Sequence, residues 1–142
     1  MKNKKALKKM LQKKPLQFIG NGIMDFEIVG ESFYQENIKK ALNTNESVYD
    51  EPITARLQLE DYNPYDENAI GVYINNYKVG HIPKRRNKRI RLLFAFANNI
   101  SIQATCNGSV YGGGDRFYGV WLDLDFNSTK KHLLDLKKNK KL

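Results

Sequence analysis

The residue types best suited to chemistry are concentrated in one stretch, EDYNPYDENAI, which runs from Glu60 to Ile70. Four carboxylates, two tyrosines and an Asn-Pro turn stand together here, although the whole chain carries a net charge of +9. Carboxylates are ligands that Mg²⁺ prefers, so Asp61, Asp66 and Glu67 could hold the metal ion of a nuclease. The alternative is structural, because Asn and Asp side chains cap backbone amides in the turns of many proteins.

Other catalytic signatures are missing from the sequence. There is no GxxxxGK[ST] phosphate-binding loop, and the run GGGD lacks the strand-to-helix context of a phosphate cradle. The single cysteine, Cys106, excludes an internal disulfide and any zinc site built on paired cysteines. Its place on the inward face of a predicted strand favours a buried, inert thiol over a nucleophile. We therefore expect a protein that is not an enzyme and has no cofactor.

The positive charge is concentrated at the two ends of the chain. Residues 1–14 carry seven lysines and no acid, and residues 130–142 carry six lysines against Asp135 alone. The body between them is mildly acidic, apart from the basic run KRRNKRIR at residues 84–91. Flexible lysine tails raise the affinity for polyanions without choosing among them. This distribution predicts attraction to nucleic acid, with solubility as the alternative role of the tails.

Nothing in the sequence predicts a membrane protein. No apolar run approaches the roughly 18 residues of a membrane span, and residues 1–14 lack the apolar segment of a signal peptide. We expect a cytoplasmic protein with no membrane partner.

The elements that must position these residues follow from the spacing of apolar side chains. Period-two alternation predicts about six strands, at residues 23–30, 53–60, 69–74, 78–82, 100–106 and 118–126. A capping box of Ser32 and Gln35 and a proline at position 83 predict two short helices, at residues 34–43 and 84–99. Because no strand-helix-strand rhythm is present, we predict a mostly β fold, a small OB-like or SH3-like β-barrel of about six strands with two short α-helices.

The order of four segments, VGESFYQ, LEDYNPYDENAIGVYI, KVGHIPK and YGVWLDLDF, resembles that of the HIRAN domain. The resemblance runs from about Ile23 to Phe126, and its specific element is NPYDxNAI followed by VGHIPK. It divides the chain into a basic N-terminal tail at 1–17, a HIRAN domain at 18–127 and a basic C-terminal tail at 128–142.

The resemblance implies a compact barrel related to the OB fold that binds single-stranded DNA at its free 3′ end. In this family the module precedes the motor of Snf-type DNA translocases that remodel replication forks, and it also occurs as a small separate bacterial protein. The present chain has no motor and resembles the separate form. The implied partners are single-stranded DNA 3′ ends and a helicase, translocase or nuclease, in DNA repair or replication-fork processing.

The family pattern also implies a set of DNA-binding residues. The residues that match its positions are Ser32, Phe33, Tyr34, Tyr65, Asp66, His81, Lys84 and Tyr118. Lys88 is added as a candidate phosphate contact because the basic helix lies near the motif. Ser32 departs from the pattern, because family members active on DNA ends can carry arginine there. The loss of a cationic phosphate contact should weaken backbone binding, and the basic tails could compensate.

The implied roles are chemically consistent. A carboxylate such as Asp66 accepts a hydrogen bond from a free 3′-hydroxyl but repels a phosphate in the same place. Tyr65, Phe33 and Tyr118 offer rings to terminal bases, at roughly 1–3 kcal/mol for each stack. Lys84 and His81 would hold the adjacent phosphates.

Several alternatives stay open at this stage. The chain could be a general RNA or nucleic-acid binder held by its tails, a metal-dependent nuclease or nuclease accessory, or a protein-interaction adaptor. Individual residues also have structural alternatives: Asp66 as a turn cap, Ser32 as a helix cap, His81 as a structural histidine and Tyr118 as a core residue.

Overall fold

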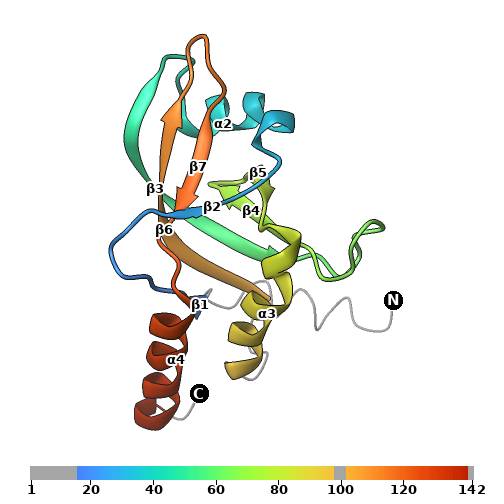
Figure 1. The fold of residues 1–142 in the computed structure, drawn as a ribbon, viewed down its shortest axis with the longest axis vertical. Helices are drawn as coiled ribbons and strands as arrows, with labels where there is room; N and C mark the ends of the chain where they lie inside the picture. Colours follow the sequence, from blue (N-terminus) through green and yellow to red (C-terminus); the bar gives the residue numbers. More distant parts are fainter. Residues whose placement is uncertain (1–15, 98–101, 141–142) are drawn as a thin grey trace.

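The computed structural model describes residues 16–97 and 102–140, and most of these residues belong to a curled β-sheet and its covering helices (Figure 1). The strands are β1 (Leu16–Gln17), β2 (Phe26–Glu27), β3 (Val48–Leu59), β4 (Ile70–Ile74), β5 (Tyr77–His81), β6 (Gln103–Gly112) and β7 (Gly119–Leu122). The helices are η1 (Glu31–Phe33), α2 (Gln35–Leu42), η2 (Lys84–Arg86), α3 (Asn87–Phe96) and α4 (Phe126–Lys140). The predicted mostly β, barrel-like fold is confirmed.

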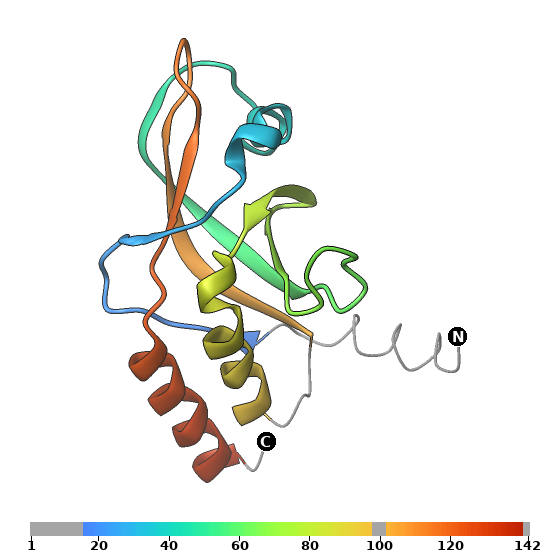
Figure 2. The same ribbon diagram turned by 45° about the vertical axis from the view of Figure 1, so that its right-hand side comes forward.

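The sheet follows the order β2-β7-β6-β3-β4-β5, and every neighbouring pair along this path is antiparallel. The short β1 adds a parallel partner to β6, a pairing that the sequence did not predict. Figure 2 shows how the long strands β3 and β6 bend, so that the sheet curls into a half-barrel.

A pair of backbone hydrogen bonds joins the two ends of this path. The amide of Val29, just after β2, donates to His81 O over 2.9 Å, and the amide of His81 donates to Val29 O over 2.9 Å. A Cβ at Gly80 would lie 2.6 Å from Val29 O, so the glycine of the VGH motif permits this close approach. The closure brings β5 against the chain after β2.

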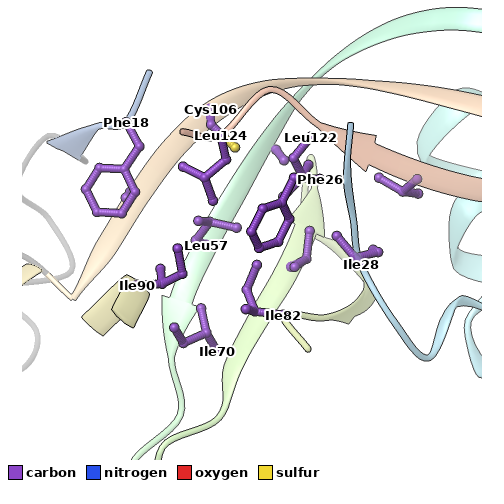
Figure 3. Close-up of a cluster of buried hydrophobic side chains, with 14 of the residues drawn as sticks. Phe18, Phe26, Ile28, Leu57, Ile70, Ile82, Ile90, Cys106, Leu122 and Leu124 are labelled. Atoms are coloured by element: carbon purple, nitrogen blue, oxygen red, sulfur yellow. The ribbon is translucent and has the colours of Figure 1, made fainter. Parts of the chain in front are cut away.

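The core lies between the curled sheet and α3. Leu57 on β3 pairs with Val72 on β4, and both side chains are fully buried, as their alternating patterns predict. Figure 3 shows labelled members of this cluster, which include Phe18, Phe26, Ile28, Leu57, Ile70, Ile82, Ile90, Leu122 and Leu124. Cys106 is buried in the same cluster, and this burial raises the pKa of its thiol to about 12. The expected burial of this thiol is therefore observed.

The C-terminal segment differs from the predicted flexible tail. Residues 126–140 form α4, which lies beside α3 in both views (Figures 1 and 2). Asp125 caps its first turn by accepting hydrogen bonds from the amide and hydroxyl of Ser128, at 2.8 and 2.7 Å. Leu133 is fully buried, and the Thr129 hydroxyl donates to Ile19 O over 2.5 Å. The prediction was wrong because lysines on the exposed face concealed the few apolar residues that dock the helix.

Two further predictions fall partly outside the residues that the structure describes, and a third, the capping box, is wrong. Residues 1–15 of the predicted N-terminal tail and positions 100–101 of the strand predicted at 100–106 lie outside the described residues. The capping box is not formed, because no side chain caps α2. Gln35 instead donates from Nε2 to Tyr118 O over 3.1 Å and accepts from the Tyr118 amide over 2.8 Å. Its side chain thus joins α2 to the chain before β7.

Candidate nucleic-acid interface

The turn between β3 and β4 is built by its own side chains. Asn63 Oδ1 accepts hydrogen bonds from the amides of Tyr65 and Asp66, at 2.9 and 3.2 Å. Asp66 Oδ1 accepts one from the amide of Asn68 at 2.9 Å. These are the side-chain-to-backbone bonds that favour Asn and Asp in turns, so the structural role considered for Asp66 is observed.

Arg91 of α3 fastens this turn to the helix. Its guanidinium donates to the carbonyl oxygens of Asn68, Glu67 and Ala69 at 2.8, 3.1 and 3.0 Å. It also donates to Asp61 Oδ1 over 2.8 Å. One of the six basic residues at 84–91 is therefore committed to holding the turn and is not a free phosphate contact.

Glu60 lies beneath the turn and joins it to β5. The residue is only 1% exposed, and its carboxylate lies 2.6 Å from Lys78 Nζ and 3.0 Å from His81 Nε2. Burial alone would raise the pKa of Glu60, but hydrogen bonds from Lys78, Asn63 and His81 outweigh it and lower the pKa below its ordinary value. Burial would likewise lower the pKa of Lys78, and its bond to Glu60 outweighs this and raises it. The charged network holds His81 in place.

A shallow groove of about 390 Å³ opens beside this network. Four residues named from the sequence line it: Tyr65, Asp66, His81 and Lys84. The Tyr65 ring is 92% exposed, whereas the Asp66 carboxylate is half-buried and accepts a hydrogen bond from Asn87 Nδ2 over 2.9 Å. Lys84 is exposed and forms no ion pair with the described part of the chain. An aromatic, an acidic and a basic residue thus line one open groove.

The other predicted residues lie outside the lining of this groove. Tyr34 contacts one of the lining residues, because its ring centroid lies 6.4 Å from that of His81. Phe33 on η1 is 87% exposed, and Ser32 beside it is also exposed. Lys88 lies on α3, one turn after Lys84, and is exposed.

Tyr118 is a core residue, so its predicted role in stacking was wrong. It is 1% exposed, and its hydroxyl donates to Glu46 O over 2.5 Å. Gly113, with a φ of +94°, packs against the ring so closely that a Cβ there would lie 2.2 Å from a ring carbon. The alternation that puts Val120 on the inward face puts Tyr118 there too, and the glycine hairpin covers it.

Five lining residues were not identified from the sequence as parts of a site: Val29, Asn63, Ala69, Ile82 and Asn87. The turn-forming bonds of Asn63 follow from the Asn-Pro signal, but its place in the groove does not. Asn87 interrupts the basic run, and nothing in the sequence indicated that it belongs to a site. It is 3% exposed, and its Oδ1 has no hydrogen-bond partner among the described residues. Its amide orientation is set by Asp66, since the opposite orientation would place two acceptors together.

Two of the three carboxylates considered for magnesium are engaged separately, and the third, Glu67, is exposed. Asp61 pairs with Arg91, and Asp66 bonds to Asn68 and Asn87. Within residues 16–97 and 102–140, no three His, Cys, Asp or Glu side chains gather to hold a metal ion. Over the same ranges, none of the helices has the length and apolar character needed to cross a membrane.

A comparison with protein families matches residues 21–111 to the HIRAN domain. The chain belongs to the HIRAN domain family. This confirms the resemblance found in the sequence, and the match includes the turn at Tyr65 and Asp66 and the histidine of VGHIPK. It ends before β7, so α4 lies outside the matched HIRAN segment.

Solved structures with similar folds include other HIRAN domains. The human HLTF HIRAN domain in a crystal structure is 25% identical, with a TM-score of 0.43, over 81% of this chain and 86% of that one. Its solution structure in a DNA-bound conformation is 22% identical, with a TM-score of 0.40, over 79% and 82%. A Lactobacillus plantarum protein is 21% identical, with a TM-score of 0.42, over 70% and 91%. No curated protein matches the chain.

Proposed function

We propose that this HIRAN protein is a non-enzymatic module that binds single-stranded DNA at a free 3′-hydroxyl end. The observation that carries the proposal is that the half-buried Asp66 and the exposed Tyr65 and Lys84 line one groove. Membership of the HIRAN family supports it, and the HIRAN domain of human HLTF has been solved in a DNA-bound conformation.

Asp66 is the group that would distinguish a terminus from an internal nucleotide. Each of its oxygens already accepts one hydrogen bond, from the Asn68 amide or from Asn87 Nδ2. A carboxylate oxygen has room for a second donor, so a 3′-hydroxyl can still bind there. A phosphate at the same place offers no proton and brings a like charge, so it is disfavoured.

Tyr65 and Lys84 would supply the attraction. Because the Tyr65 ring is almost wholly exposed, it can stack on a base without displacing a protein contact. Lys84 forms no ion pair with the residues that the structure describes, so it can hold a phosphate. A neutral His81 that donates from Nε2 to Glu60 leaves only an acceptor at Nδ1, so it holds a phosphate only when protonated.

The wider role follows from this activity as part of the same proposal. A module that marks free 3′ ends would serve DNA repair or replication-fork processing, beside a helicase, translocase or nuclease that acts on those ends. Its limits are taken as residues 18–127, with α4 packed against α3 as an addition to the family fold.

The test is fluorescence anisotropy at near-physiological salt, with a short single-stranded DNA that ends in a 3′-hydroxyl or a 3′-phosphate. The intact protein should bind the hydroxyl end roughly tenfold or more tightly, because a hydrogen bond to a charged group contributes ~1.5–3 kcal/mol. Asp66→Asn should abolish most of this preference. Glu67→Gln is the matched control, since it removes one exposed negative charge from the same turn.

Two results would contradict the proposal. If both oligonucleotides bind alike and only removal of the terminal lysines weakens them, the protein is a non-specific polyanion binder. If Glu67→Gln changes the ratio of affinities as much as Asp66→Asn does, general charge repulsion explains the preference.

A further inference from the structure

A second, smaller cleft lies between α3 and α4, away from the groove that contains Asp66. Its volume is about 180 Å³, and two arginines, Arg86 at the end of η2 and Arg89 of α3, contribute to its lining. Its floor includes Phe26 of β2 and Phe126 at the start of α4. The side-by-side placement of α3 and α4 that forms it is visible in both ribbon views (Figures 1 and 2).

Both arginines are held over aromatic rings. Arg86 Cζ lies 5.0 Å from the centroid of Phe26, and Arg89 Cζ lies 4.1 Å from that of Phe126. Their spacing of three residues places them on the same face of the helix. A guanidinium that stacks on a ring keeps its N–H edges available for hydrogen bonds. The two rings thus hold the guanidinium groups in place and leave the guanidinium N–H donors free to bind a ligand.

Neither guanidinium group is used in a close polar contact. Among the described residues, the Arg86 and Arg89 side chains form no ion pair and no hydrogen bond. One carboxylate, Asp125, lines the cleft, but its Oδ2 caps α4 by accepting both bonds from Ser128. These bonds and, to a smaller extent, the positive charge of Arg89 lower the pKa of Asp125, so it stays ionised at neutral pH. Two guanidinium groups against one engaged carboxylate leave the cleft net positive.

The cleft and the groove share the same end of α3. Lys84 lines the groove and Arg86 lines the cleft, two residues further along η2. Similarly, Asn87 lines the groove and Ile90 lines the cleft. The lining residues of the groove and of the cleft thus alternate within residues 84–90, so the two hollows are neighbours on the same segment of the chain.

We propose that the cleft between α3 and α4 binds a backbone phosphate of nucleic acid through the Arg86 and Arg89 guanidinium groups. The planar forks match the paired oxygens of a phosphodiester, which a lysine cannot match. Phe126 belongs to α4, so this contact depends on a helix that lies outside the matched HIRAN segment. The inference rests on the proposed function in taking nucleic acid as the ligand, but it does not depend on 3′-end selection.

The experiment compares two double variants on two single-stranded DNAs with 3′-hydroxyl ends, one of about 3 nucleotides and one of about 12, since OB-type sites cover ~4–16 nucleotides. Arg86→Gln with Arg89→Gln should lower the affinity for the longer DNA about tenfold and leave the affinity for the shorter one nearly unchanged. It should also reduce the slope of log affinity against log salt concentration for the longer DNA by about 0.7, because each neutralised phosphate of a single strand contributes ~0.7. Lys131→Gln with Lys138→Gln removes the same charge from exposed positions of α4 and should change binding less than threefold.

A lysine variant separates the guanidinium fork from its charge and retains the aliphatic stem that covers Phe26. Arg86→Lys with Arg89→Lys should lose most of the affinity for the longer DNA. Thermal unfolding of every variant should stay close to that of the parent protein. If the lysine variant binds like the parent, or if the two glutamine pairs weaken binding equally, the proposed cleft site is wrong.

The same titrations separate this inference from the proposed function. The ratio of affinities for 3′-hydroxyl and 3′-phosphate ends reports on the groove and should be unchanged in the arginine variants. If the parent protein binds the two kinds of 3′ end equally, but the arginine variants still bind the longer DNA more weakly, end selection is wrong and the cleft site stands. If the parent protein still prefers the 3′-hydroxyl end, but Arg86→Gln with Arg89→Gln weakens binding no more than Lys131→Gln with Lys138→Gln does, the cleft site is wrong and end selection stands.

Discussion

The Asn87 side-chain amide donates a hydrogen bond from Nδ2 to Asp66 Oδ2 across 2.9 Å. Asn87 is the first residue of α3, and Asp66 lies in the turn between β3 and β4. The bond therefore connects the basic helix to the carboxylate of the groove. With the bond from the Asn68 amide to Oδ1, it sets the orientation of the carboxylate.

Asn87→Ala should loosen Asp66 while leaving the rest of the groove in place. We expect the preference for a 3′-hydroxyl over a 3′-phosphate to fall several-fold. The free energy of unfolding should fall by ~1 kcal/mol, which is typical of one lost hydrogen bond. Anisotropy and urea unfolding measure the two quantities separately. An unchanged preference with reduced stability would show that Asn87 is structural only and does not position Asp66.

Tyr65 and Tyr118 should respond to substitution in opposite ways. Tyr65 is 92% exposed, so Tyr65→Ala should hardly change stability but should weaken DNA binding by ~1–3 kcal/mol through loss of a base stack. Tyr118→Phe removes only the hydroxyl that donates to Glu46 O, so it should lower the free energy of unfolding by ~1 kcal/mol and leave binding unchanged. DNA titration and urea unfolding of both variants test this pairing. A binding defect in Tyr118→Phe would contradict the buried role of this ring.

The buried Glu60 should make stability depend on pH in the acid range. Its pKa is lowered on folding from the ordinary 4.5, so its contribution is present above that value and is lost as pH falls through the folded-state pKa. Lys78, whose pKa is raised from 10.5, contributes below that value and loses its contribution as pH rises through the folded-state pKa. The free energy of unfolding should therefore fall on the acid side of about pH 4.5 and on the alkaline side of about pH 10.5.

Glu60→Gln tests this linkage. It should lower the free energy of unfolding at neutral pH by ~2–4 kcal/mol, because Lys78 and His81 lose a buried partner. It should also flatten the acid decline in urea midpoints between about pH 7 and about pH 3. Glu36→Gln is the control, since Glu36 pairs with Lys39 on the surface and its side chain is 77% exposed. Equal effects of the two substitutions would exclude a special role for Glu60.

Leu133 should show that α4 is part of the folded unit. Leu133→Ala removes a fully buried side chain and should cost ~2–4 kcal/mol of unfolding free energy. Its neighbour Leu134 is 44% exposed, so Leu134→Ala should cost about 0.5 kcal/mol or less. Urea unfolding of the two variants provides the comparison. Equally small effects would support the loose C-terminal tail that the charge pattern predicted.

Features with local causes were predictable from the sequence. Alternation put Leu57 and Val72 on the inward faces of strands, where they are buried. The turn at Asn63 and Asp66 follows from side chains that bond to backbone amides two or three residues away. The grouping of Tyr65, Asp66, His81 and Lys84 in one groove followed from a family pattern. Such a pattern indicates tertiary proximity because members of a family share a fold.

Other features were decided by contacts between distant segments. Alternation indicates the face of Tyr118 but not the Gly113 hairpin that covers it. Lysine content suggested a loose tail where Leu133 docks a helix, and nothing local marked Asn87 as the partner of Asp66. The sequence by itself therefore determined the location of most strands, the turn and the family. Only the tertiary structure decided which side chains remain exposed to a ligand, because burial depends on segments that pack together from far along the chain.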